Sequence, residues 1–537
     1  MRHRRVLAAT LTGLAVVLVW WGLTGPDQLE ALTPAAFVRL PVEALLLAAL
    51  VLVLPSQAAR VVVGVAGVVL GLLTVVRVLD MGFYEALNRP FDSVIDWRYL
   101  GSAVGLVDDS VGRAAAVAAV VGAALLTVAF LVLMPWALLR LTRVVRTHRR
   151  TSARVVAALL ALWLVAAAFG VRTGDGARFA SAGTATYAYG QVARIPSELR
   201  DQRAFAHAAA QDPLRRVPSG DLLTGLRGKD VLLVFVESYG RVAVQSSSFA
   251  PSVDRVLDDG TRRLRAHGFA ARSAFLTSPT FGAISWLAHS TLQSGLWVDS
   301  QQRYDALVTS PRLTLSQAFG RAGWRTVADV PANTHDWPQG AFYHYDRVYD
   351  SRNVGYRGPR FGYPTMPDQY TLDAFHRLEL APPDRAPVMA EIDLITSHAP
   401  WSRTPHLIAQ SRVGDGSVFE GMPEQAPSET VIWKSPDRVR AAYAQSIRYS
   451  LDALVTFLET YGNDDTVVVF LGDHQPATVV SGEGAGHDVP VTMVARDPTV
   501  LDRISGWGWA PGLRPPPDAP VWRMDSFRDR FLAAFGS

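Results

Sequence analysis

Two short runs of apolar, β-branched residues end on metal-ligand side chains and lie far apart in the sequence. Residues 231–236 read VLLVFV and precede Glu237, while residues 466–471 read TVVVFL and precede, after one glycine, Asp473 and His474. Such runs are typical of strands buried in a parallel sheet, and open α/β sheets bind ligands beyond the carboxyl ends of their strands. The runs therefore predict one sheet that brings two carboxylates and an imidazole together around a divalent metal ion. The alternative is that Asp473 caps the next element and His474 is a satisfied polar neighbour.

The first 173 residues are dominated by Ala, Val and Leu, unlike the rest of the 537-residue chain. A helix that crosses a bilayer needs roughly 20 apolar residues. Stretches of about this length lie near 6–23, 37–54, 61–79, 115–136 and 153–170. Arg39 and Glu43 stand at the start of the second stretch, where both side chains can reach the interface or pair. The sequence thus predicts a transmembrane domain of five helices over residues 1–173.

The arginines predict the orientation of these helices. Arg2, Arg4 and Arg5 precede the first stretch, and six more arginines between residues 140 and 154 crowd the connection between the fourth and fifth stretches. Because basic connections stay in the cytoplasm, the N-terminus and this connection are expected there. Five crossings then place everything after about residue 174 outside, as in a multi-pass protein of a bacterial-type plasma membrane. A cleaved signal peptide is the alternative for the first stretch, and the four further stretches disfavour it.

The remaining residues are expected to form a juxtamembrane linker (174–228) and an extracytoplasmic catalytic domain (229–537). In the latter, strand-like segments alternate with helix-like ones. The predicted strands are 231–236, 270–276, 324–330, 388–395, 466–471 and 489–494, and the predicted helices include 252–267, 313–322 and 438–461. This alternation predicts an α/β domain with a mostly parallel central sheet and helices on both faces. The Pro/Ser/Gly-rich segment 402–436 is expected to be a surface excursion.

Composition excludes several kinds of chemistry. The chain has no cysteine, and so no disulfide, thiolate nucleophile or cysteine-based zinc site. Its net charge of +4 is largely due to the arginines near the membrane. These arginines are expected to be solvated or to contact anionic lipid, and no nucleic-acid partner is expected.

A hydroxyl nucleophile is predicted between the two runs. Residues 277–289 read TSPTFGAISWLAH and pass from a Gly/Pro turn into a helix that opens at Ser285. The start of a helix favours anions, and a divalent ion beside the hydroxyl would lower its pKa and make it a nucleophile toward phosphorus. The alternative is a plain N-cap serine. Thr280 and Ser278 are rival nucleophiles on the same turn.

Three histidines complete the set of candidates. His398 follows the predicted strand 388–395, and His487 lies in a Gly-rich loop after Asp473. Each alone is more often a surface histidine than a ligand, but together they could hold phosphate oxygens or protonate a leaving group. His289, one helical turn after Ser285, is interpreted first as a helix-packing residue.

With these residues identified, the chain resembles the alkaline phosphatase superfamily, in its membrane-anchored sulfatase-like branch, which includes lipoteichoic acid synthases and lipid A phosphoethanolamine transferases. The resemblance covers roughly residues 229–500 and implies an alkaline phosphatase/sulfatase-like fold. It implies one divalent metal ion (Mn, Mg or Zn) held by Glu237, Ser285, Asp473 and His474, with Ser285 as the catalytic nucleophile. It also implies substrate-binding roles for His398 within SHAPW, for His487, and for Trp337 within NTHDW.

The chain departs from this branch in several places. The synthases usually carry Thr as nucleophile, with a basic residue before it and an Arg after the aromatic residue, whereas here Ile284 precedes Ser285 and Pro338 follows Trp337. Sulfatases make formylglycine from Cys or Ser followed by x-Pro-x-Arg, a motif that is missing here. Sulfate-ester hydrolysis is therefore disfavoured. The phosphoethanolamine transferases typically carry several disulfides, unlike this chain.

The expected function is a membrane-bound, metal-dependent transferase that moves a lipid head-group phosphate, of phosphoglycerol or phosphoethanolamine type, onto a cell-envelope acceptor. Its partners would be membrane phospholipid and an envelope polymer or glycolipid. The alternatives are a phosphodiester or sulfate-ester hydrolase of the same fold and a non-catalytic membrane protein. The sequence leaves the oligomeric state open.

Overall fold

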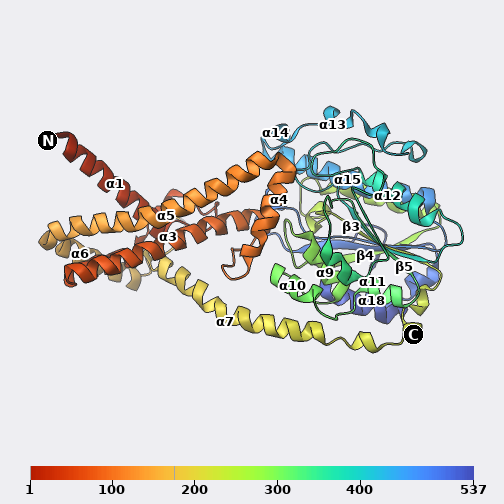
Figure 1. The fold of residues 1–537 in the computed structure, drawn as a ribbon, viewed down its shortest axis with the longest axis horizontal. Coiled ribbons are helices and arrows are strands. Elements are labelled where there is room, and N and C mark those ends of the chain that lie inside the picture. The colour runs from red at the N-terminus through yellow and green to blue at the C-terminus, as the bar shows by residue number, and fades with distance from the viewer. Residues whose placement is uncertain (1, 175) are drawn as a thin grey trace. The chain divides into compact units, whose positions relative to one another are not determined.

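The computed structural model describes residues 2–174 and 176–537 (Figure 1). The chain divides into two compact units. Unit 1 comprises residues 1–85 and 89–201, and unit 2 comprises residues 86–88 and 202–537.

Unit 1 is helical. Four of its described helices are long and apolar enough to cross a membrane: His3–Thr24 within α1 (Arg2–Thr24), α3 (Ser56–Leu87), α5 (Arg113–Thr147) and α6 (Arg149–Ala168). These four contain most or all of the first, third, fourth and fifth predicted stretches. Two further helices, α4 (Tyr99–Val111) and α7 (Gly183–Ala210), lie before α5 and after α6 in the chain.

The second predicted stretch, 37–54, forms a shorter helix than expected. Helix α2 spans only Val42–Val53, twelve residues, or about 18 Å, against roughly 30 Å of bilayer hydrocarbon. Pro41 is its N-cap, and Pro55 follows its C-cap. Proline lacks a backbone N–H and disfavours helical conformation in the residue before it, so the two prolines limit the helix. The described residues therefore include four long apolar helices rather than five. Upstream, β1 (Leu40–Pro41) pairs in parallel with β2 (Ala180–Ser181).

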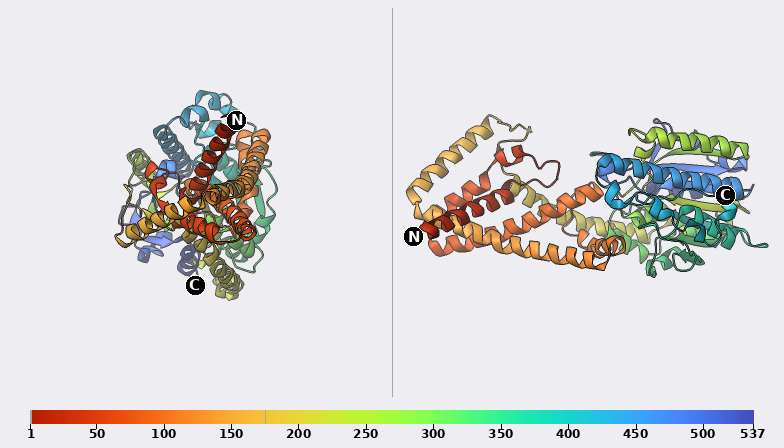
Figure 2. Two further views of the ribbon diagram at one scale, coloured as in Figure 1. Left: turned by 90° about the vertical axis from the view of Figure 1, so that its left-hand side faces the viewer. Right: turned by 90° about the horizontal axis from the view of Figure 1, so that it is seen from above.

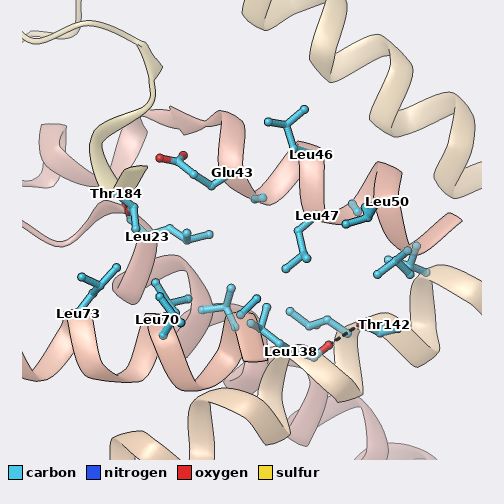
Figure 3. A pocket seen from close by; sticks show the side chains of 18 residues that line it. Leu23, Glu43, Leu46, Leu47, Leu50, Leu70, Leu73, Leu138, Thr142 and Thr184 are labelled. Atoms are coloured by element: carbon cyan, nitrogen blue, oxygen red, sulfur yellow. Dashed lines mark hydrogen bonds between the residues drawn. The ribbon is translucent and has the colours of Figure 1, made fainter. Parts of the chain in front are cut away.

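Unit 1 contains an apolar cavity of about 460 Å³ among α1, α2, α3 and α5 (Figure 3). Aliphatic side chains form most of its wall, and Glu43 is the carboxylate among its lining residues. The Oε1 atom of Glu43 accepts a hydrogen bond from the backbone N–H of Ala185 at 2.8 Å, while Oε2 is buried without a hydrogen-bond partner.

Unit 2 is built on a nine-stranded sheet of order β10-β4-β9-β8-β3-β7-β5-β6, with β11 paired to β4. Its strands are β3 (Asp230–Val236), β4 (Ala270–Thr277), β5 (Arg325–Val330), β6 (Arg347–Asp350), β7 (Val388–Leu394), β8 (Thr466–Gly472), β9 (Asp488–Ala495), β10 (Ala510–Pro511) and β11 (Val521–Arg523). The pairs β8-β3, β3-β7, β7-β5, β5-β6 and β4-β11 are parallel, whereas β4-β9, β8-β9 and β4-β10 are antiparallel. The sheet is thus mixed but mostly parallel.

Helices cover both faces of this sheet (Figures 1 and 2). The helices of unit 2 that follow β3 are α8 (Ala250–Ala266), α9 (Ser285–Ser294), α10 (Gln301–Val308), α11 (Leu315–Arg321), α12 (Asp368–Phe375), α13 (Met422–Gln425), α14 (Glu429–Ile432), α15 (Pro436–Tyr461), α16 (Thr478–Ser481), α17 (Pro498–Asp502) and α18 (Phe527–Phe535). Side chains from α8, α12 and α15 pack with Leu232, Val234 and Val236 of β3 in one apolar core. Side chains from α9, α11 and α18 pack with the alternate residues of β3, Val231, Leu233 and Phe235, in a second core.

The segment 402–436 is more buried than the sequence suggests. It contains the short helices α13 and α14, and its residues Val413, Phe419 and Ile432 are buried in the same core as α15. The segment still lies largely at the surface, as predicted, and these scattered apolar residues anchor it in the core.

Candidate active site

The parallel pairing of β3 with β8 brings Glu237 and Asp473 together. Val236 is paired with Gly472 in the register of these strands. The residues that follow them, Glu237 and Asp473, therefore leave the sheet side by side. A Cβ atom on Gly472 would lie only 1.9 Å from the carbonyl oxygen of Tyr239. The close approach of the two strand ends therefore depends on glycine at position 472.

Asp473 is fixed by backbone donors on one side only. Its Oδ1 atom accepts hydrogen bonds from the N–H groups of Ser238 and His474, both at 2.7 Å. Its Oδ2 atom is buried, has no hydrogen-bond partner and lies 3.6 Å from Nε2 of His474. The carboxylate is thus held in place with one oxygen turned toward the imidazole.

His474 is oriented by the backbone as well. Its Nδ1 lies 2.8 Å from the carbonyl oxygen of Gln475, so Nδ1–H donates there and the Nε2 lone pair is left for another partner. Nε2 lies 3.4 Å from Oε1 of Glu237. This is the arrangement expected of a histidine that binds a metal through Nε2.

Ser285 joins the same group at the first residue of α9. Its hydroxyl donates a hydrogen bond to Oε2 of Glu237 at 3.0 Å, and its Oγ lies 3.3 Å from Nε2 of His474. The preceding residue, Ile284, has φ +70°, a conformation that costs a β-branched residue about 1–3 kcal/mol. The fold holds this strained turn directly before the predicted nucleophile. Glu237, Ser285, Asp473 and His474 are called the Ser285 cluster below.

The rival hydroxyls lie elsewhere on the turn. The Ser278 hydroxyl donates to the carbonyl oxygen of Asp473 at 2.5 Å, and the Thr280 hydroxyl lies 3.5 Å from that of Ser278. The structure therefore brings Ser285, rather than Thr280 or Ser278, into contact with the Glu237 carboxylate.

Close packing of these charges shifts their protonation. Burial raises the pKa of Asp473, and the neighbouring Glu237 charge adds to this, giving a value of about 6. Burial lowers the pKa of His474, but the charges of Asp473 and Glu237 outweigh it and raise the value to about 9. Burial also disfavours ionised Glu237, yet His398 and His474 hold its pKa well below the usual range.

The Ser285 cluster fits a divalent metal ion. Ligand atoms of Glu237, Asp473 and His474 all lie within 4.8 Å of one another. The orphaned Oδ2 of Asp473 and Nε2 of His474 both face this group, and a divalent cation that replaces the Nε2 proton would satisfy both. Two carboxylates, one imidazole and a hydroxyl suit Mn, Mg or Zn.

Two of the three predicted substrate-binding residues lie near this cluster. His398 follows β7, stacks on Tyr363 with ring centroids 3.6 Å apart, and has Nδ1 2.5 Å from the carbonyl oxygen of Ala399. Burial lowers the pKa of His398, although the Glu237 charge opposes this. The ring of His487 packs against Phe281, with centroids 5.4 Å apart, on the turn that leads to Ser285.

Trp337 is placed differently. Its ring packs on Tyr343, with centroids 5.5 Å apart, and the Tyr343 hydroxyl is 2.8 Å from Oγ of Ser290 in α9. Among the contacts of the described residues, none joins Trp337 directly to the Ser285 cluster.

Sequence reasoning missed a second group of ligand-type side chains. His289 packs against Phe235, with ring centroids 3.7 Å apart, as expected of a helix-packing residue. However, its Nδ1 also lies 3.1 Å from Oε1 of Glu391 and 3.6 Å from Oδ1 of Asp393. Two acidic residues at alternate positions of a buried strand were the available signal, because charge on a buried face requires a partner. His289, Glu391 and Asp393 are called the His289 cluster below.

A mixed, mostly parallel sheet with a hydroxyl, two carboxylates and an imidazole at its edge defines an α/β fold of the sulfatase type. The sulfatase family profile matches residues 229–493, which contain the whole Ser285 cluster. These residues form a domain of the sulfatase/alkaline phosphatase superfamily, whose members are typically metal-dependent enzymes acting on phosphate or sulfate esters.

Several solved structures are similar to this chain, among them the following three. The lipoteichoic acid synthase LtaP of Listeria monocytogenes is 15% identical, with 51% of this chain and 67% of that chain covered and a TM-score of 0.36. The periplasmic domain of EptC from Escherichia coli, solved with Zn, is 12% identical (60% and 86% covered, TM-score 0.39). The phosphoglycerol transferase GacH of Streptococcus pyogenes is 13% identical (64% and 91% covered, TM-score 0.34). No curated protein matches the chain.

Proposed function

We propose that the protein is a membrane-bound, metal-dependent transferase that moves a lipid head-group phosphate, of phosphoglycerol or phosphoethanolamine type, onto a cell-envelope acceptor. The proposal rests chiefly on the contact of the Ser285 hydroxyl with Glu237 and His474 at the start of α9. A hydroxyl so placed is suited to attack phosphorus. The long apolar helices of unit 1 keep the enzyme at the membrane, where its lipid donor resides.

Glu237, Ser285, Asp473 and His474 would hold one divalent ion, which neutralises charge at the hydroxyl and at the phosphate oxygens when bound. The chain's own groups supply the positioning. The 3.0 Å hydrogen bond to Glu237 directs Oγ of Ser285, and the positive end of the α9 dipole favours the anionic phosphoryl group at that point. His398 and His487 would steady the nonbridging oxygens.

The reaction proceeds by two successive displacements at phosphorus. In the first, a bond forms between Oγ of Ser285 and phosphorus, the bond from phosphorus to the lipid alcohol breaks, and the serine proton is passed to the departing alcohol. In the second, a bond forms between the acceptor oxygen and phosphorus, and the bond from phosphorus to Oγ of Ser285 breaks. Nδ1–H of His398 donates to Ala399, so its Nε2 can accept the proton of the incoming hydroxyl and pass it on to the released Oγ of Ser285.

Replacement of the nucleophile tests the proposal. Ser285→Ala should lower turnover of labelled phospholipid by at least about 10³-fold while the protein stays folded. Mass spectrometry of the wild-type chain exposed to lipid should find the added head group on the peptide containing Ser285. Thr280→Ala is the matched control and should retain the adduct. An adduct on Thr280, or full activity of Ser285→Ala, would refute the assignment.

The acceptor separates a transferase from a hydrolase. Membranes that contain envelope glycan and head-group-labelled lipid should accumulate label on the glycan. Label found only as free head group would identify water as the acceptor and the protein as a phosphodiesterase.

We further propose five crossings, with residues 1–173 in the membrane, 174–228 as a linker and 229–537 outside the cytoplasm. The N-terminal arginines and the arginines at the adjoining ends of α5 and α6 belong on the same side of the membrane. Helices α1, α3 and α5 would provide three crossings between these two groups of arginines. An odd number of crossings would put the two groups on opposite sides of the membrane. A crossing by the segment that contains α2 makes the number even and leaves unit 2 outside.

The absence of native cysteine gives a direct test of this topology. Single-cysteine variants Ser56→Cys, His148→Cys and Ser505→Cys each carry one thiol. A membrane-impermeant maleimide applied to intact cells should label only Ser505→Cys. Protection of Ser505→Cys would place unit 2 in the cytoplasm, and labelling of Ser56→Cys would show that α2 does not complete a crossing.

A further inference from the structure

The His289 cluster joins helix α9 to the neighbouring strand β7. Glu391 and Asp393 are paired with Leu233 and Phe235 in the register of β3 and β7, on the sheet face that α9 covers. The side chains of His289, Glu391 and Asp393 are only 13%, 4% and 18% exposed. A histidine and two carboxylates are thus enclosed one helical turn from Ser285.

The atoms of this cluster are arranged like those of the Ser285 cluster. In each, an imidazole nitrogen lies between two carboxylates of different residues, and the ligand atoms are within 4.8 Å of one another. In each, one carboxylate oxygen is buried without a hydrogen-bond partner: Oδ2 of Asp473 in the first and Oδ1 of Asp393 in the second. Oδ1 of Asp393 lies 3.6 Å from Nδ1 of His289, so the orphaned oxygen points into the cluster.

The surroundings of Glu391 match those of a metal-binding carboxylate. Its Oε2 accepts hydrogen bonds from Nε2 of Gln293 at 2.5 Å and from the Tyr345 hydroxyl at 2.7 Å. Oε1 is left facing Nδ1 of His289. Outer hydrogen bonds that fix one oxygen and free the other are typical of metal ligands.

A second cation is compatible with the charge of the two clusters. They bring together four carboxylates: Glu237, Asp473, Glu391 and Asp393. With one divalent ion at the Ser285 cluster, two negative charges are left, which protons on His289 and Asp393 can neutralise. A second divalent ion would neutralise the same two charges in place of these protons.

We propose that His289, Glu391 and Asp393 bind a second divalent cation, distinct from the ion of the Ser285 cluster. One imidazole with two carboxylates suits Zn, Mn or Mg. The site uses residues of α9 and β7 only, and so stands whether the enzyme proves to be a transferase or a hydrolase. The ion would fasten the helix that carries Ser285 to the sheet.

Metal stoichiometry of the full-length protein tests the site. After chelation, the detergent-solubilised chain is reloaded with Mn²⁺ or Zn²⁺, freed of excess by gel filtration, and measured by elemental mass spectrometry. Two ions per chain are expected for the wild type and one for Asp393→Asn. Glu237→Gln, which disables the other cluster, should also retain one. Asp329→Asn is the matched control: it alters a buried carboxyl without hydrogen-bond partners on the adjacent strand β5 and should keep two.

Other metal counts would contradict the proposed site. One ion in the wild type and an unchanged count in Asp393→Asn would show that the cluster is an ion pair between protonated His289 and Glu391. If Asp393→Asn does not fold, by circular dichroism, His289→Gln and the wild-type count decide instead. A wild type with one ion overturns the proposal, whereas loss of Ser285 activity alone would not.

Discussion

Gly472→Ala should destabilise the fold and weaken metal binding together, because this residue sets how closely the ends of β3 and β8 approach. The added Cβ atom would lie 1.9 Å from the carbonyl oxygen of Tyr239, and the obstacle is backbone rather than a flexible side chain. Relief to 3.0 Å, the shortest separation that real Cβ atoms show, requires the strand ends to part by about 1 Å. The next residue, Asp473, would move with them.

Such a movement has a calculable cost. It lengthens the 2.7 Å hydrogen bond from the Ser238 N–H to Asp473 beyond a useful distance, and a bond to a charged group is worth about 1.5–3 kcal/mol. Overpacking adds about 1–3 kcal/mol. The expected destabilisation is therefore about 2.5–6 kcal/mol, or roughly 4–9 °C in the thermal midpoint for a domain of the size of unit 2. Displacement of Asp473 and His474 should also weaken metal binding by about 10–100-fold.

The assay is Mn²⁺ titration of the purified full-length chain by calorimetry, together with thermal unfolding. Gly506→Ala is the matched control, since a Cβ atom there meets nothing within 4 Å. If Gly472→Ala binds Mn²⁺ as tightly as the wild type and melts at the same temperature, the close approach of the strand ends does not shape the site.

Other perturbations test the fold around the site. Burial raises the pKa of Asp368 to about 6 from an ordinary 3.8, so the folded state binds its proton more tightly. Stability should fall by about 3 kcal/mol as pH rises from about 4 to above 6, and Asp368→Asn should flatten this part of the thermal-midpoint profile. Arg528→Met should cost about 3–5 kcal/mol in thermal unfolding, because it leaves the fully buried Asp212 with the more distant Arg312; adding Asp212→Asn should recover part of this. Removal of metal by a chelator should lower the thermal midpoint, and Mn²⁺ at 100 times its Kd should restore about 2.7 kcal/mol.

Much of unit 2 could be predicted from the sequence because its signals are local. The apolar runs that became β3, β7 and β8 are continuous, and α15 has helical periodicity over many turns. The antiparallel direction of β9 relative to β8 was not predicted, because it depends on the length of the segment that connects the two strands rather than on the residues of β9. Residues 473–487 contain only the four-residue α16, and parallel strands require a longer crossover.

The membrane unit shows where apolarity alone misleads. The stretch 37–54 is long enough to cross a bilayer, yet Pro41 and Pro55 limit its helix to Val42–Val53. The mean hydropathy of a stretch depends on its side chains alone and does not include the backbone N–H that proline lacks. The two prolines were the signal that could have shortened this helix in the prediction.

The Ser285 cluster could be predicted from the sequence, whereas the His289 cluster could not. The reason lies in the alternation of side chains along β3. Val231, Leu233 and Phe235 face α9, and Glu237 is the next residue of that alternation. Strand ends are visible in a sequence, so Glu237 could be identified. Glu391 and Asp393 lie inside a strand, and only the pairing of Phe235 with Asp393 shows that they share this face. A slip of one residue between β3 and β7 would turn both carboxylates away from His289. The register of a single strand pair therefore determines whether α9 meets one set of metal-ligand side chains or two.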